Sequence, residues 1–130
     1  MRMALEFDWS DQEKLVVPVQ LRSESQVARA LWEAAPFRSR VQLWGDEIYF
    51  TTPVTAPEEA TVETVQEGMV AYWPPGRALC LFYGPTPISG PGEIRPASPV
   101  VPVGRCEVDP QELRKVPEGA QVLVRSESGN

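Results

Sequence analysis

The chain consists of short apolar segments separated by proline- and glycine-rich turns, a pattern typical of a small β-protein. Between residues 3 and 9 every second residue is large and apolar, as in a strand that buries one face. Residues 15–21 form a second apolar segment, in which Pro18 indicates an edge position or a bulge because proline cannot donate to a β-ladder. The two segments predict an N-terminal hairpin.

Helical periodicity follows this hairpin. From Val27 onward, apolar residues recur at the i, i+3, i+4, i+7 spacing of an amphipathic helix. Ser23 and Gln26 have the spacing of a capping box at its start, and Pro36 ends it. A shorter helix is predicted after Asp109, where an N-cap acid, a proline and a second acid follow in the preferred order.

Six further segments have the length and composition of strands: residues 37–44, 47–52, 69–73, 78–83, 99–106 and 120–126. The first two are joined by Gly45-Asp46, a glycine-first loop that matches strand twist. With the N-terminal pair they make eight strands. The chain of 130 residues is therefore predicted to be a single domain over residues 1–130, mainly β, folded as a closed eight-stranded barrel with one main helix and one short helix. Because side chains fill the interior of such a barrel, a ligand would bind outside it.

The two-residue loop sets the register of the first central hairpin, so that Leu43 faces Ile48 and Gln42 faces Tyr49. The predicted outer face then carries Arg40, Gln42, Trp44, Glu47, Tyr49 and Thr51. Tryptophan, tyrosine, glutamine and an acid on one surface are typical of a binding groove. The alternative is that a loop, a helix or another subunit covers these aromatics. Within this face, Glu47 either acts as an acid or base when desolvated or forms an ion pair with Arg77 or Arg40.

Composition excludes several classes of function. A net charge of −6 without a basic stripe argues against nucleic-acid binding, and no apolar stretch has the length of a membrane helix. The absence of histidine removes Ser-His and Cys-His catalysis and the commonest zinc ligand, so we expect neither a metal nor a cofactor. The two cysteines have no metal or redox spacing. The N-terminus has no signal-peptide core, so a cytoplasmic location is expected, and the excess of arginine over lysine and 14 prolines favour a thermophilic source.

Three sequence runs resemble one known family. They are WGDEIYFTTP at residues 44–53, YWPPGRALCLFYGPTP at residues 72–87 and PASPV at residues 96–100. Together they are similar to a family of small prokaryotic proteins with a cyclophilin-like barrel, atypical relatives of cyclophilins that are often described as a domain of unknown function. The likeness covers nearly the whole chain and implies the cyclophilin order of strands and helices.

The resemblance implies a site on the outer face of the barrel. Cyclophilins are peptidyl-prolyl isomerases that hold the proline ring in an apolar pocket, while an arginine donates to the prolyl nitrogen. Such a donor weakens the amide resonance, which sets a barrier of ~18–20 kcal/mol, selectively in the transition state. In this chain the corresponding polar residues would be Arg40 and Gln42, with Tyr49 opposite.

Three hypotheses follow for the same outer face. The first, slightly favoured, is a binding module for a small molecule or a proline-containing peptide. The second is a weak or specialised prolyl isomerase that uses Arg40 and Gln42. The third is a surface that another copy of the chain covers in a homo-oligomer. The residues expected to bind are Trp44, Glu47, Tyr49, Tyr72, Trp73, Phe82 and Arg77.

Overall fold

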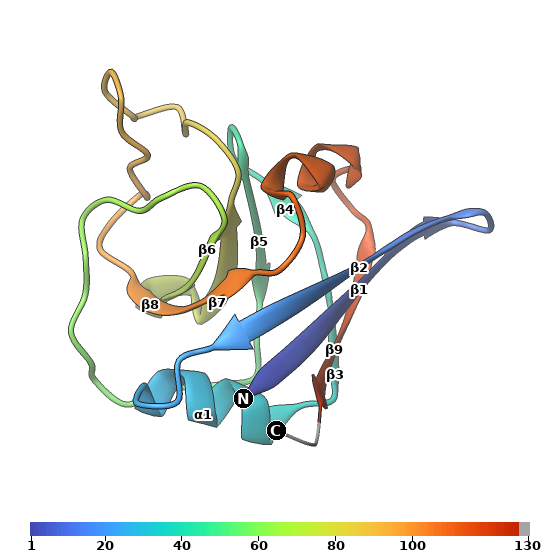
Figure 1. Cartoon of the computed structure of the whole chain (residues 1–130), viewed down its shortest axis with the longest axis horizontal. Coiled ribbons are helices and arrows are strands. Elements are labelled where there is room, and N and C mark those ends of the chain that lie inside the picture. Colours follow the sequence, from blue (N-terminus) through green and yellow to red (C-terminus); the bar gives the residue numbers. More distant parts are fainter. Residues whose placement is uncertain (128–130) are drawn as a thin grey trace.

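The structure, a computed structural model, describes residues 1–127; residues 128–130, which the predicted domain includes, lie outside the described residues. Along the described chain the elements are β1 (Arg2–Ser10), β2 (Glu13–Leu21), α1 (Gln26–Ala34), β3 (Phe37–Arg40), β4 (Gln42–Leu43), β5 (Glu47–Thr51), β6 (Met69–Trp73), the 3-10 helix η1 (Pro74–Gly76), β7 (Ala78–Phe82), β8 (Val101–Cys106), the 3-10 helix η2 (Pro110–Lys115) and β9 (Gln121–Glu127). Figure 1 shows how these elements are arranged.

The strands form one nearly closed antiparallel barrel, in the order β3-β9-β1-β2-β8-β6-β7-β5-β4. The sheet has nine strands where eight were predicted, because the segment expected at residues 37–44 divides at Val41. Its first half, β3, pairs with β9, and its second half, β4, pairs with β5. A single continuous piece of chain therefore joins the two edges of the sheet. The prediction of a mainly β barrel with one main helix and one short helix is confirmed.

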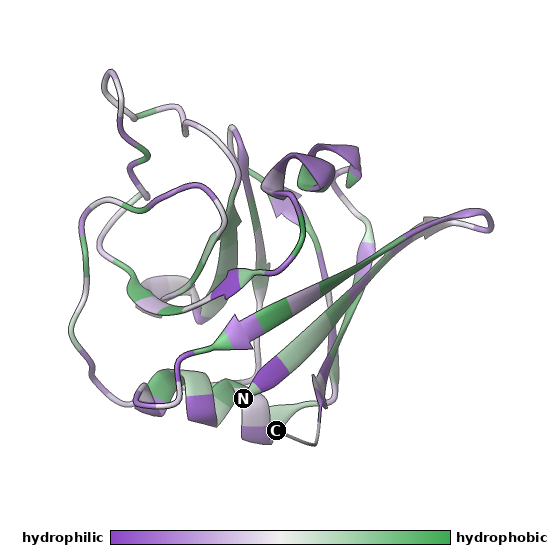
Figure 2. Ribbon diagram, in the orientation of Figure 1, coloured by the Kyte–Doolittle hydropathy of each residue, from purple (hydrophilic) through white to green (hydrophobic). Residues whose placement is uncertain are grey.

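The barrel interior is a continuous apolar core. Figure 2 shows hydrophobic residues along the strands and hydrophilic ones at the tip of the β1–β2 hairpin. The core draws on every face of the barrel, with Phe7 from β1, Phe50 from β5 and Leu81 from β7 all fully buried. Alternation along each strand explains this arrangement, because successive side chains of a strand point to opposite faces. The interior therefore has no room for a ligand, as a barrel of this size predicts.

The main helix begins with a different cap from the one predicted. Ser25, and not Ser23, is its N-cap residue, and the Ser25 hydroxyl accepts a hydrogen bond from the backbone N–H of Ala28 at 3.0 Å. A carboxylate oxygen of Glu59 accepts another from the backbone N–H of Val27 at 3.0 Å. Both groups satisfy N–H groups that have no partner within the helix. The second contact comes from a distant loop, so spacing near the helix could not predict it.

A long loop, residues 84–100, connects β7 to β8 and projects from the barrel (Figure 1). Isolated bridges between Val62 and Val100 and between Val65 and Ile94 attach this loop to residues 52–68, which connect β5 to β6. These bridges stand where a short strand was expected between residues 61 and 65. The loop therefore forms a second layer outside the barrel.

Candidate functional site

The outer face of β5, β7 and β6 carries a second apolar cluster, separate from the barrel core. On β7, Leu79 and Leu81 point into the barrel, whereas Cys80 and Phe82 point outward. The outer cluster consists of Val65, Ala71, Ala78, Cys80, Phe82 and Val100. The partly buried side chains of Tyr49 and Trp73 pack against it. All six residues of the cluster are buried, and Val100 at the end of the loop of residues 84–100 is one of them.

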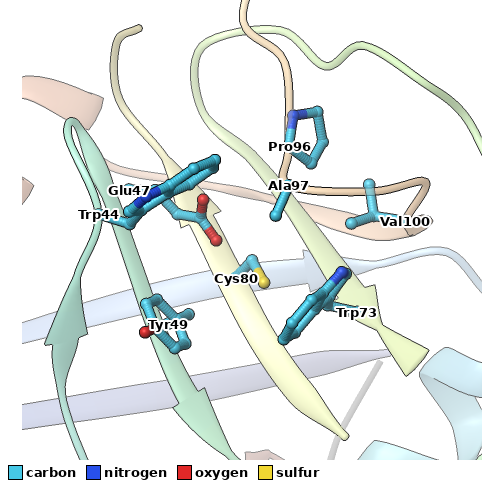
Figure 3. Close-up of a pocket in the computed structure, with 8 residues that line it drawn as sticks. All are labelled: Trp44, Glu47, Tyr49, Trp73, Cys80, Pro96, Ala97 and Val100. Atoms are coloured by element: carbon cyan, nitrogen blue, oxygen red, sulfur yellow. The ribbon is translucent and has the colours of Figure 1, made fainter. Parts of the chain in front are cut away.

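A cavity of about 250 Å³ lies between this face and the covering loop (Figure 3). Its lining is mostly apolar and consists of Trp44, Glu47, Tyr49, Trp73, Cys80, Pro96, Ala97 and Val100. The strands supply the floor and the loop supplies the opposite wall. In Figure 3 the carboxylate of Glu47 points into the space between Trp44 and Cys80. The site is therefore an aromatic hollow with a single acidic group inside it.

Local contacts hold the two tryptophans in place. The Trp73 indole N–H donates to the Ser98 hydroxyl at 2.7 Å, which ties β6 to the covering loop. The same ring lies on Gly76, where an added Cβ would come within 2.6 Å of it. Trp44 is the last residue before the predicted two-residue loop. The first residue of this loop, Gly45, has φ +59°, and a Cβ added to it would lie 2.9 Å from the Cα atom of Thr86. Glycine is thus required at Gly76 to accommodate the Trp73 ring and at Gly45 for the close approach of the backbone at Thr86.

Glu47 is the most unusual group of the site. Its side chain is 5% exposed, and its Oε1 atom is buried with no hydrogen-bond partner within residues 1–127. Burial raises the pKa of Glu47 from its ordinary 4.5 to about 7, although a hydrogen bond with the Cys80 thiol acts in the opposite direction. Near neutral pH the carboxyl group is therefore present in both its charged and its neutral form. A carboxyl poised in this way is typical of functional sites.

The Cys80 thiol lies at the floor of the cavity beside this carboxyl. Burial, followed by the charge of Glu47 and their hydrogen bond, raises the pKa of Cys80 well above its ordinary value. Because the thiolate is the nucleophilic form, a thiol in these surroundings is a weak nucleophile. Cys80 is therefore a wall of the site and a hydrogen-bond donor to Glu47.

The structure brings together four of the predicted site residues: Trp44, Glu47, Tyr49 and Trp73. Phe82 belongs to the outer cluster but is fully buried beneath the cavity lining. Gln42 is exposed and pairs with Tyr49 as predicted, without lining the cavity. The predicted register thus holds for this part of the hairpin.

Three other predicted residues lie elsewhere. Tyr72 points into the barrel, where its hydroxyl donates to the backbone oxygen of Val54, because it alternates with Trp73 on β6. Arg40 is on β3, opposite Gln121 of β9, and its guanidinium donates to the backbone oxygen of Gly119 at 2.9 Å. The division of the strand at Val41 turns Arg40 towards β9, into a polar hollow with Glu118.

Arg77 is exposed after η1, and its guanidinium reaches the Thr55 hydroxyl at 3.4 Å. The expected ion pair of Glu47 with Arg77 or Arg40 is therefore wrong, because both arginines bind other groups. The sequence also did not identify Cys80, Pro96, Ala97 and Val100 as lining residues. For the last three a signal existed, since they belong to the run PASPV, but an aperiodic loop does not reveal which strand face it covers.

The structure places this chain among small β-barrel proteins that have a buried apolar interior and a cavity on the outer face of the barrel. Comparison with known proteins identifies the class more closely. The model of the Cyclophilin-like family matches residues 2–125. The chain therefore belongs to the cyclophilin-like family, which confirms the resemblance found in its sequence.

A solved structure agrees with this assignment. The chain is similar to the solution structure of a hypothetical protein from Archaeoglobus fulgidus, with 40% sequence identity and a TM-score of 0.79. The similarity covers 98% of this chain and 95% of that chain. Among curated proteins no match is found. In the described residues, no helix is long and apolar enough to cross a membrane, and no three acidic, cysteine or histidine side chains gather as metal ligands would.

Proposed function

We propose that this protein is a binding module and that its ligand occupies the outer cavity over β5, β7 and β6. One observation carries the proposal: a buried carboxyl group, that of Glu47, stands without a full set of partners in an aromatic-walled cavity. Buried polar groups in native proteins are normally satisfied. A ligand with a polar group directed at Glu47 and an apolar body between the tryptophans would complete the site.

The prolyl isomerase is the weaker candidate. That mechanism needs a cationic donor in the groove, aimed at the prolyl nitrogen. Within the described residues, the lining of the cavity contains no arginine or lysine. Arg40 donates to Gly119 on another side of the barrel. The geometry therefore favours binding over isomerisation.

A fragment screen by NMR tests the proposal. The indole N–H signals of Trp44 and Trp73 report on the two walls, and Trp9 and Trp32 are internal controls away from the cavity. We expect fragments to shift the first pair selectively. The variant Ala97→Trp, which fills the cavity from the exposed loop side, should abolish these shifts. If no fragment in a broad library shifts the Trp44 and Trp73 signals, the proposal fails.

An isomerase assay separates the two candidate functions. Cis/trans exchange of a short Ala-Pro peptide is measured by NMR with the unmodified protein and with Arg40→Ala. We expect no acceleration above the uncatalysed rate for either protein. Acceleration by the unmodified protein that Arg40→Ala loses would establish the isomerase instead.

A further inference from the structure

The charge of Glu47 has no counter-charge in its surroundings. Burial and the Cys80 thiol are the two influences that set its pKa, and no arginine or lysine of the described chain contributes. The other groups that face it are neutral or acidic. Tyr49 lies two residues along β5, Tyr83 directly follows β7, and the neighbouring Asp46 is paired with Arg114 at 3.0 Å. Trp73 on β6 and the loop residues that line the cavity carry no charge. A buried carboxylate without a cation is rare in native proteins.

Aromatic rings surround this carboxylate. Trp44 and Tyr49 lie on one side of the cavity in Figure 3, and Trp73 lies on the other. The Trp73 N–H is already bound to Ser98, so this ring has no donor left to offer a ligand. The faces of tryptophan and tyrosine rings attract organic cations, and cages of such rings recognise alkylated ammonium groups. An acidic group among them adds charge complementarity.

We infer that the ligand of this site is a small organic cation, an ammonium group that carries alkyl substituents, held by Glu47 and the rings of Trp44, Tyr49 and Trp73. This inference rests on the proposed function and specifies its ligand class. The cavity of about 250 Å³ is below the ~300–1,000 Å³ typical of drug-sized ligands, and it suits a head group of this size. An anion would be repelled by the carboxylate, and a neutral ligand would leave the charged form of Glu47 uncompensated. The ammonium group can belong to a free metabolite or to an alkylated lysine side chain, which share this chemistry.

Choline and its neutral isostere 3,3-dimethylbutan-1-ol test the inference, because the two have the same shape and differ in charge. We expect choline to bind the intact protein at least about tenfold more tightly than the isostere. Binding should shift the Trp44 and Trp73 indole signals. Choline affinity should fall as the pH is lowered through about 7, because protonation removes the charge of Glu47. A short peptide with trimethyllysine, run beside choline, distinguishes the two sources.

Two variants of equal charge change make the test specific. Glu47→Gln should remove the preference for choline over the isostere, whereas Glu33→Gln, an exposed acid on α1, should retain it. If the isostere binds as well as choline, or if neither cation binds while other fragments still shift the two indole signals, the inference is wrong and the binding module stands. If nothing shifts those signals, both the inference and the proposed function fail.

Discussion

The barrel interior and the outer cluster are built from the same strands but differ in how completely they are satisfied. In the interior, the Tyr72 hydroxyl donates to the backbone oxygen of Val54, and the surrounding apolar side chains are buried. Outside, Glu47 retains a buried oxygen without a partner, beside a cavity of about 250 Å³. One face of β5 and β7 thus serves stability, and the opposite face is left incomplete.

The difference follows from how completely each face is enclosed. A closed barrel buries its interior from all sides, so each inward side chain is fixed by many neighbours. The outer cluster is covered by loops alone, namely residues 84–100 and part of the connection between β5 and β6, which contributes Val62 and Val65. An incomplete cover allows a buried carboxyl and an open cavity to persist at one site without disturbing the core. Such local departures from good packing are expected at functional sites.

The largest expected effect on the free energy of unfolding comes from a substitution in the barrel interior. Leu81 is fully buried in the barrel core, so Leu81→Ala should lower the free energy of unfolding by about 2–5 kcal/mol, through lost burial and the cavity left behind. Urea unfolding measures the loss. Val16→Ala on β2, where the side chain is 48% exposed, is the control and should change stability by less than about 0.5 kcal/mol. Equal losses in the two variants would contradict a tightly packed interior.

The next effect concerns the outer face and depends on pH. The pKa of Glu47 is raised in the folded state to about 7 from 4.5, so between these values the folded protein binds more protons than the unfolded chain. The stability that this carboxyl contributes is therefore complete below pH 4.5 and is lost as the pH rises through 7. The loss corresponds to about 3 kcal/mol.

Glu47→Gln removes this titration. Urea unfolding of both proteins at about pH 4 and about pH 9 should show the variant gaining about 3 kcal/mol relative to the parent over this range. Glu33→Gln on α1, which is exposed, should follow the parent at both pH values. A constant difference between Glu47→Gln and the parent would mean that Glu47 titrates normally and that the outer face is not desolvated.

Much of the fold followed from the sequence because it depends on local patterns. Alternation in β1 and the Gly45-Asp46 loop each predicted the element that the structure shows. Pro102 and Gly104 are residues typical of a bulge or an edge position, and the register of β8 against β6 shifts between them. The division of a strand at Val41 was missed, since barrel closure acts between distant strands and leaves no local signal.

Four of the eight residues that line the candidate site were predicted from the sequence. Trp44, Glu47 and Tyr49 lie on one hairpin, so alternation was enough to place them on one face. Arg40 was misplaced, because the same alternation was carried across the division at Val41, where the chain changes its partner strand. The sequence left two alternatives for Glu47, desolvation or an ion pair, and burial in the folded chain, which raises its pKa, decides for desolvation.

The smallest expected effect concerns Cys80 on β7, the strand that contributes side chains to both the barrel interior and the outer cluster. Cys80 lies between the inward Leu79 and Leu81 on β7, and its thiol is hydrogen-bonded to Glu47 at the cavity floor. Cys80→Ala should cost only about 1 kcal/mol of stability or less, because it enlarges an existing cavity instead of opening one in the packed core. It should also raise the pKa of Glu47 further, since the thiol stabilises the charged carboxylate.

Carbon-13 NMR titration of the Glu47 carboxyl measures this change, with Cys106→Ala as the matched control. Cys106 is the other free thiol and has no contact with Glu47 that affects its pKa. A lowered pKa in Cys80→Ala would mean that water enters the enlarged cavity and solvates the carboxylate more effectively than the thiol does. An increase confined to Cys80→Ala would show that the chain itself provides one weak donor to Glu47 and leaves the rest of its charge for a ligand to satisfy.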